Sequence, residues 1–170
     1  MIRRFVLASA ILIAAGSAAP AMAGTATSNL TVSSTVPNNC TISTAAIDFA
    51  SYDPISANKN TNATGTGTVT VTCTSGASAT IKLGQGSNAE AASSDAAPLR
   101  RLKDAGTNHL SYGLYKDNIH TQIWGNTAGT GVSHTGTGSA QAMTVFGRIA
   151  AGQSVPAGSY SDTVVAEVSF

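Results

Sequence analysis

Residues 67–74 of this 170-residue chain read Gly-Thr-Val-Thr-Val-Thr-Cys-Thr, and this stretch decides the fold class. In an extended chain, Val69, Val71 and Cys73 fall on one face. The threonines between them fall on the opposite face. β-branched residues that alternate in this way are typical of a strand with one buried face. The stretch therefore predicts a half-buried β-strand.

Six further short runs with strand character lie to either side of this stretch, and none shows an apolar repeat of 3.6 residues over a useful length. Clusters of Gly, Asn, Ser and Pro separate them. The six runs are residues 39–49, 79–83, 110–116, 121–124, 140–149 and 159–170. Seven such strands predict an all-β, two-layer antiparallel sandwich. The intervening residues 53–66, 84–108 and 127–138 are expected to form surface loops.

The first 23 residues have the parts of an export signal. They begin with Arg3 and Arg4, continue with an apolar run over residues 5–15, and end in Ala21-Met22-Ala23. The apolar run is shorter than the roughly 20 residues that cross a bilayer, so no transmembrane segment is expected. Removal of residues 1–23 would leave 147 residues, enough for one domain over residues 38–170.

The composition of residues 24–170 supports strands and excludes one class of partner. Thr, Ser, Asn and Gly supply 66 of these 147 residues, a composition that favours strands and turns over helices. Seven basic and eight acidic side chains give a net charge of −1. Such a chain offers little to a phosphate backbone, so nucleic acid is not an expected partner.

Cys40 and Cys73 form the only cysteine pair in the sequence. Export places them in an oxidising compartment, so they are expected to form a disulfide. They have no nearby pair of histidines and lack the spacing of metal ligands. His109, His120 and His134 accompany no nucleophile motif. The sequence therefore predicts no metal site, no cofactor and no enzyme activity.

The last predicted strand has one clear apolar face, formed by Val164, Ala166, Val168 and Phe170. Because it is expected to run to the C-terminus, no residues follow it to form a neighbouring strand. A sandwich that needed one more strand would have to obtain it from elsewhere.

Residues 28–36 are a candidate for that strand. Leu30, Val32, Ser34 and Val36 share one face, and Pro37-Asn38-Asn39 then separates the segment from Cys40. It is either the first strand of its own domain or a strand that adds to the exposed sheet edge of a neighbouring copy. The pattern alone does not separate these two hypotheses.

Several motifs along the chain resemble, in order and spacing, those of the spore coat protein U family, the subunits of archaic chaperone-usher pili. The motifs are Asn39-Cys40-Thr41-Ile42, Ile47-Asp48-Phe49 with Tyr52, residues 67–74, Ile81-Lys82-Leu83-Gly84, Arg101-Leu102, Leu110-Ser111-Tyr112-Gly113-Leu114-Tyr115, Trp124-Gly125, Phe146-Gly147-Arg148-Ile149 and residues 157–164. One position departs from the family, which often has Gly after the aromatic residue of the second motif. Here Ala50 follows Phe49.

The resemblance implies an incomplete immunoglobulin-like sandwich that lacks its last strand and is completed by an N-terminal donor strand, residues 24–37, of a neighbouring subunit. It implies identical or related pilin subunits, a periplasmic chaperone and an outer-membrane usher as partners. The fibre would be exported through the periplasm to the cell surface, for adhesion and biofilm formation. The implied donor residues are Leu30, Val32, Ser34 and Val36. The implied acceptor groove and chaperone contact comprise Val164, Ala166, Val168 and Phe170.

Two alternative functions belong to other classes. One is a self-complemented secreted coat protein, in which residues 28–36 close their own sandwich. The other is a secreted or tip module that binds carbohydrate or another surface. Trp124 is expected in the core rather than on a sugar-binding platform. Residues 100–103, the one basic cluster, are expected in a solvated loop or a subunit contact, and the scattered aspartates, Asp162 among them, in turns or on solvated faces.

Overall fold

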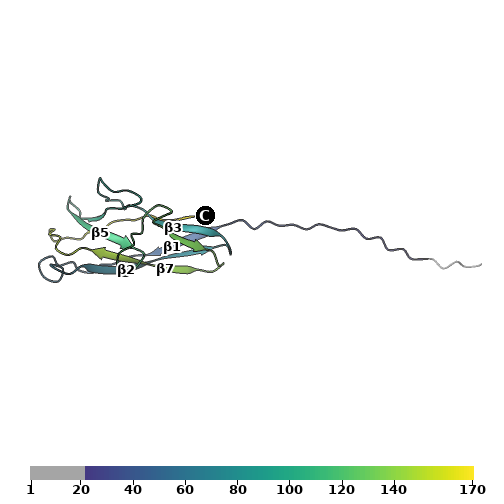
Figure 1. Ribbon diagram of the computed structural model, residues 1–170, viewed down its shortest axis with the longest axis horizontal. Coiled ribbons are helices and arrows are strands. Elements are labelled where there is room, and N and C mark those ends of the chain that lie inside the picture. Colours follow the sequence, from purple (N-terminus) through teal and green to yellow (C-terminus); the bar gives the residue numbers. More distant parts are fainter. Residues whose placement is uncertain (1–21) are drawn as a thin grey trace, which may run out of the picture. The chain divides into compact units, whose positions relative to one another are not determined.

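The computed structural model describes residues 22–170, so the predicted export signal lies almost entirely outside the described residues. The chain divides into a first unit that ends at Thr35 and a second unit, Val36–Phe170. Residues 22–39 form neither helix nor strand. All the strands belong to the second unit (Figure 1).

Two antiparallel sheets make up the domain (Figure 1). The first sheet has the order β1-β2-β7-β5-β4. Its strands are β1 (Cys40–Ala45), β2 (Ala63–Cys73), β7 (Gln141–Ile149), β5 (His109–Tyr115) and β4 (Arg100–Lys103). The second sheet has the order β6-β3-β8, formed by β6 (Val132–Thr135), β3 (Ser78–Leu83) and β8 (Ala166–Ser169). The described residues contain no helix, and the all-β prediction is confirmed.

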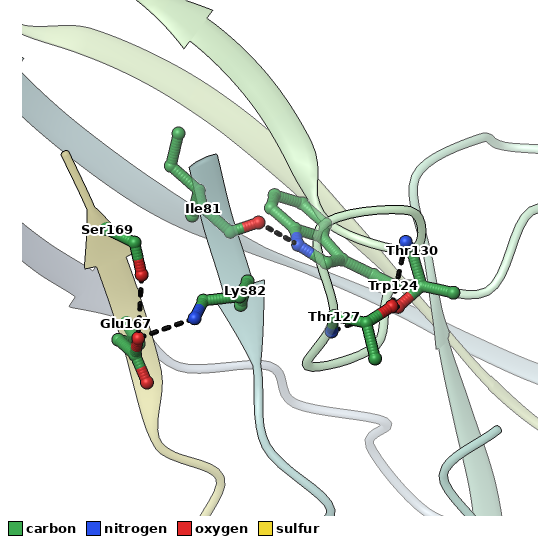
Figure 2. Close-up of polar contacts among 7 residues, drawn as sticks. All are labelled: Ile81, Lys82, Trp124, Thr127, Thr130, Glu167 and Ser169. Atoms are coloured by element: carbon green, nitrogen blue, oxygen red, sulfur yellow. Dashed lines mark hydrogen bonds and ion pairs between the residues drawn. The ribbon is translucent and has the colours of Figure 1, made fainter. Parts of the chain in front are cut away.

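The main core lies where the two sheets face each other. Val69 and Val71 of β2 are buried there together with Ile81 and Leu83 of β3. Trp124 is fully buried against them, and its Nε1 donates a 3.0 Å hydrogen bond to the carbonyl oxygen of Ile81 (Figure 2). The alternation read from residues 67–74 therefore faces the core as predicted, and Trp124 is a core residue.

The predicted disulfide is present between Cys40 and Cys73. These residues lie directly opposite each other at the start of β1 and the end of β2, with 4.1 Å between their Cα atoms. A short separation of this kind marks a non-hydrogen-bonded pair of an antiparallel ladder. The crosslink thus joins the first residue of the edge strand β1 to the interior strand β2.

Three of the predicted loops were wrong in part. β4 lies within residues 84–108, β6 lies within 127–138, and β2 begins inside 53–66. β4 and β6 are short edge strands with polar residues, so long-range pairing rather than a local pattern forms them. Conversely, residues 121–124 form no strand and contribute only an isolated bridge between Ile123 and Tyr115.

The strand predicted over residues 39–49 ends at Ala45. Two glycines, Gly67 of β2 and Gly147 of β7, leave space into which the following segment packs. A Cβ on Gly67 would lie 2.5 Å from Cγ1 of Ile47, and one on Gly147 would lie 2.7 Å from Cζ of Phe49. Ile47 and Phe49 therefore occupy space that side chains at these two glycines would fill. The chain leaves the ladder there and packs against β2 and β7.

Candidate functional site

Residues 163–169 of the C-terminal segment are hydrogen-bonded to the β3 side only within residues 22–170, whereas Ser161 exchanges two backbone hydrogen bonds with Lys103 of β4. β8 pairs with β3 and is the last strand of its sheet. The pairing continues before β8, where the amides of Gly84 and Ser87 donate to the carbonyl oxygens of Val165 (2.8 Å) and Thr163 (3.0 Å). Backbone direction alternates along an antiparallel strand, so the N–H and C=O groups of Val164 and Ala166 point to the unpaired edge.

A surface ion pair joins β8 to β3 on their outer face. Nζ of Lys82 lies 2.6 Å from Oε1 of Glu167, which also accepts a 2.8 Å hydrogen bond from the Ser169 hydroxyl (Figure 2). These contacts lower the pKa of the Glu167 carboxyl. The pair is partly exposed and contributes little to stability, but it favours this register of β8 on β3.

β1 supplies a second unpaired edge, because it is the last strand of the other sheet among the described residues. Thr74 donates its amide hydrogen to the carbonyl oxygen of Asn39 at 2.9 Å. By the same alternation, the backbone groups of Ile42 and Thr44 point away from β2. The domain thus has one unpaired edge in each sheet on the side where β1 and β8 meet.

Two adjoining cavities lie between the C-terminal segment and the segment that follows β1. The smaller, about 220 Å³, is lined by apolar side chains that include Ile47, Val69, Val145, Val164 and Ala166. The larger, about 890 Å³, includes Tyr52, Leu110, Val155 and Tyr160. Ile47, Phe49, Leu102 and Asp162 line both cavities. We call the two cavities together the C-terminal groove.

The C-terminal side of the groove carries one tightly bonded carboxylate, Asp162. Its Oδ2 accepts a 2.7 Å hydrogen bond from the Tyr112 hydroxyl. Its Oδ1 accepts hydrogen bonds from the backbone amides of Ser87 (2.9 Å) and Asn88 (3.2 Å) and from the Asn88 side chain (3.0 Å). Burial and the hydrogen bond to Asp162 raise the pKa of Tyr112. Asp162 is therefore a structural acceptor at the groove, and its expected place in a turn or on a solvated face was wrong.

Arg100 crosses from the first sheet to the second beside the groove. Its side chain is 1% exposed, and it donates from Nε to the Gly84 oxygen (2.9 Å) and from Nη2 to the oxygens of Leu83 (2.9 Å) and Trp124 (2.8 Å). Burial lowers its pKa to about 10. The expectation of a solvated loop for residues 100–103 was wrong for Arg100, which satisfies two buried carbonyl oxygens and the half-buried one of Gly84.

The structure places the four predicted acceptor residues differently. Val164 and Ala166 are half-buried and line the smaller cavity. Val168 packs instead beside the disulfide, against Cys73 and Ala79. Phe170 follows β8 and is 55% exposed. The groove is thus open beside Val164 and Ala166 and closed near Val168.

Sequence reasoning missed other residues that line the groove. Ile47 and Phe49 were assigned to a regular strand, and Tyr112 was not assigned to the site. The apolar alternation of Ile47 with Phe49 was a signal that these side chains face inward. Nothing local indicated that Tyr112 would reach Asp162, since 50 residues separate them.

The predicted donor residues are exposed. Leu30 is 87%, Val32 85% and Val36 78% accessible to solvent, and Ser34 is exposed as well. Alternate large apolar side chains in contact with water are unfavourable, and such an arrangement is typical of a segment that binds a partner.

The histidines do not form a common site. His109 begins β5, His120 lies in a turn with φ of 56°, and His134 belongs to β6. Within residues 22–170, no three His, Cys, Asp or Glu side chains gather as metal ligands would. The part of the chain that the structure describes also has no helix suited in length and hydrophobicity to cross a membrane.

The two sheets and their unpaired edges define an immunoglobulin-like β-sandwich of the kind found in chaperone-usher pilus subunits. The chain belongs to the Spore Coat Protein U domain family, whose profile matches residues 26–167. It is 42% identical over 158 residues to Protein U of Myxococcus xanthus, covering 89% of this chain and 88% of that protein.

A solved structure shares the fold. It is the pre-assembly complex of the chaperone CsuC with the tip adhesion subunit CsuE from the archaic chaperone-usher Csu pili of Acinetobacter baumannii. The similarity has a TM-score of 0.56 at 21% identity and covers 80% of this chain. The chain spans 40% of the solved chain that it matches.

Proposed function

We propose that this protein is a structural subunit of an archaic chaperone-usher pilus that polymerises non-covalently by donor-strand exchange. One observation carries the proposal: an apolar groove lies beside two unpaired strand edges, in a chain whose residues 28–36 expose alternate apolar side chains. A strand from a second copy that enters this groove satisfies both edges and buries its own apolar face.

The energetics favour a long-lived contact. Each backbone hydrogen bond contributes about 0.5 to 1.5 kcal/mol net. Burial of Leu30, Val32 and Val36 contributes roughly 1.5 to 3 kcal/mol for each side chain. Separation of two subunits is slow because the contacts along the strand must be released together. This assembly needs no covalent chemistry and no cofactor.

The domain geometry supports one direction for the donor strand. The start of β1 and the C-terminus lie at the same end of the domain (Figure 1). The chain's own residues 36–39 join the domain at that end. A donor from another copy must therefore leave the groove at the opposite end if subunits are to follow one another in a fibre. Such a donor runs parallel to β1 and antiparallel to β8.

The same groove supports the proposed partners. Before assembly, a periplasmic chaperone would cover the apolar side chains beside Val164 and Ala166, and the crystallised chaperone complex of the Csu tip subunit is a precedent for such a pairing. An outer-membrane usher would then exchange the chaperone for the next donor. In this scheme residues 1–23 direct export, residues 24–37 form the donor and its tether, and residues 38–170 form the domain. The fibre would serve adhesion and biofilm formation at the cell surface.

The test is removal of residues 24–37 from the exported protein. Electrophoresis of unboiled samples from cells with the wild-type protein should show a ladder of multimers that collapses on heating. The truncated subunit should still bind the chaperone and add at a fibre end, but it should form no ladder on its own. Normal ladders from the truncated protein, or only monomers from the wild type, would reject the proposal. The second result is the one expected of a self-complemented coat protein.

A further inference from the structure

We propose that the donor strand of a second copy lies in the C-terminal groove in one register, with Ser34 against Asp162. This inference rests on the proposed function and on the antiparallel direction derived above. The register places Leu30 opposite Ala166, Val32 opposite Val164, Ser34 opposite Asp162 and Val36 opposite Tyr160. Ser34 and Asp162 are then the pair that determines the register.

Polarity is the first argument. Ser34 is the only polar residue among the four donor residues that share the apolar face. Asp162 is the only charged residue among the described residues that line the smaller cavity. Its Oδ1 accepts three hydrogen bonds, whereas its Oδ2 accepts only the one from Tyr112. A carboxylate oxygen has two lone pairs, so Oδ2 can accept a further hydrogen bond from the Ser34 hydroxyl.

The neighbouring registers lose the pairing of the Ser34 hydroxyl with the Asp162 carboxylate. A shift of two residues, the smallest that keeps the same face inward, places either Val36 or Val32 against the Asp162 carboxylate. One of these shifts also moves Ser34 to Val164, in the apolar part of the groove. The Ser34 hydroxyl then loses the Asp162 carboxylate as its acceptor, and a carboxylate covered by valine loses contact with water.

The shape of the groove is the second argument. Ala166 has the smallest side chain of the half-buried residues on the C-terminal segment, and it lines the open cavity. Leu30, the largest donor side chain, faces Ala166 in the proposed register. The shift that brings Val32 to Ala166 moves Leu30 to Val168, which already packs against the residues around the disulfide. The groove is closed at that point.

The register also predicts which outward-facing residues become neighbours. The backbone groups of Val165 already face β3, so its partner on the donor forms a non-hydrogen-bonded pair with it. That partner is Thr31, with an expected Cα separation of about 4.5 Å. Two cysteines at this separation lie within the range for a disulfide, about 4.4 to 6.8 Å. Val165 is 69% exposed, so the pair is accessible to an oxidant.

The test is a disulfide between successive subunits of the full-length protein. Thr31→Cys combined with Val165→Cys should give, after mild oxidation, a ladder that survives boiling and collapses on reduction. Two matched controls shift the donor cysteine by two residues: Asn29→Cys and Ser33→Cys, each with Val165→Cys. Both controls should form heat-labile ladders like the wild type, with at most a few per cent of the covalent product.

Each outcome separates the register from the proposed function. A stronger covalent ladder from either control, or none from all three variants while heat-labile ladders persist, would overturn the register and leave the polymer intact. A disulfide between residues 31 and 165 of the same chain, seen only in monomers, would overturn the exchange of strands between subunits. Mixing a Thr31→Cys subunit with a Val165→Cys subunit supplies a check, because a covalent dimer can then arise only between two chains.

A second measurement tests the role of Ser34 itself. Ser34→Val should lower the temperature at which the ladder collapses, whereas Ser34→Thr, which retains the hydroxyl, should lower it less. A collapse temperature that is equal or higher for Ser34→Val would show that residue 34 faces an apolar site, and the proposed pairing with Asp162 would be wrong.

Discussion

The Tyr112 hydroxyl donates a 2.7 Å hydrogen bond to Oδ2 of Asp162, and this contact joins β5 to the C-terminal segment across 50 residues of sequence. The Tyr112 ring also meets Phe49 edge to face, with 6.0 Å between the ring centroids. Tyr112 thus links the C-terminal segment, which carries Asp162, to the segment that follows β1. These are the two sides of the C-terminal groove.

The raised pKa of Tyr112 predicts a loss of stability in alkali. Its pKa in the folded state lies above the unfolded value of about 10, so its contribution is complete below pH 10. The contribution is lost as the pH rises above 10 toward the folded pKa. The free energy of unfolding in urea, measured from pH 8 to 11, should therefore fall more steeply for the wild type than for Tyr112→Phe.

The titration of Arg100 has the opposite effect on stability, and Arg100 is present in both the wild type and Tyr112→Phe. Its pKa is lowered to about 10, so the cost of burying its charge is relieved as the pH rises above that value. The difference between wild type and Tyr112→Phe reports the titration of the tyrosine together with its coulombic coupling to Arg100. Parallel curves for the two proteins would show that Tyr112 does not titrate differently on folding.

Replacement of Arg100 should strongly destabilise the domain. Arg100→Met removes the donor from the buried carbonyl oxygens of Leu83 and Trp124 and from the half-buried carbonyl oxygen of Gly84. Hydrogen bonds from a charged group are worth about 1.5 to 3 kcal/mol each, so we expect a loss of at least about 3 kcal/mol in the free energy of unfolding. Chemical denaturation of the disulfide-bonded domain measures it.

Arg101→Met is the matched control for Arg100. Arg101 is only half-buried, and it donates to the carbonyl oxygens of Asn88 (3.1 Å) and Ala89 (3.0 Å). Water can replace these hydrogen bonds, so its loss should cost less. Equal effects of the two substitutions would contradict the interpretation of Arg100 as a buried link between the sheets.

Ala50→Gly should stabilise the protein. Ala50 has φ of 55°, a left-handed conformation, and its amide donates a 2.7 Å hydrogen bond to Oδ1 of Asp48. This conformation costs an alanine about 1 to 2 kcal/mol, part of which is offset by the greater freedom of glycine in the unfolded chain. We expect a gain of roughly 0.5 to 1 kcal/mol, measured by thermal unfolding.

Ala46→Gly provides the control for this substitution. Ala46 does not have a positive φ, so glycine there should destabilise by roughly 0.5 to 1 kcal/mol. A loss of stability at both positions would contradict the strain argument for Ala50.

Loss of the disulfide should cost about 3 to 4 kcal/mol in the loop-entropy model, since Cys40 and Cys73 close a loop of about 34 residues. Cys40→Ser combined with Cys73→Ser should shift the midpoint of denaturation accordingly. The wild type under reducing conditions should behave like the double variant. A shift of less than about 1 kcal/mol would indicate that the unfolded chain is already restricted in this region.

Val32→Arg should prevent polymerisation, because it places a charge in the apolar groove of the neighbouring subunit. Thr31→Arg, on the opposite face of the same strand, should preserve the heat-labile ladder. The native disulfide should form in both variants, as a non-reducing assay on the purified subunit would show. A ladder of normal length from Val32→Arg would exclude this face as the buried one.

Strands with a local signal could be predicted from the sequence. The alternation of apolar and polar residues around Val69 and Val71 predicted β2, and similar patterns predicted β3, β5 and β7. β4 and β6 could not be found in this way, because they are four-residue edge strands whose pairing depends on segments far away in the sequence. The buried role of Arg100 was hidden for the same reason, since its acceptors lie 16 to 24 residues away.

The residues of the candidate site also divide into those with a local sequence signal and those without one. Val164 and Ala166 were predicted to face inward because a strand alternates every two residues, and both do. Phe170 continues that alternation but follows β8 and remains exposed. Asp162 and Tyr112 carried no local signal, because a carboxylate in a polar sequence is usually in a turn or on a solvated face.

The sequence by itself determined the all-β class, the single disulfide partner and the apolar faces of residues 28–36 and 164–168, because these depend on a two-residue period and on a single possible pairing. Only the tertiary structure decided which strand edges lie unpaired, where the chain leaves β1, and which side chains line the groove between them. Those features arise from pairing and packing between segments far apart in the chain. Gly67 and Gly147 leave space for side chains of the segment after β1, and Asp162 accepts a hydrogen bond from Tyr112 of β5. No local sequence pattern predicts such contacts, since each contact depends on the fold that brings its two partners together.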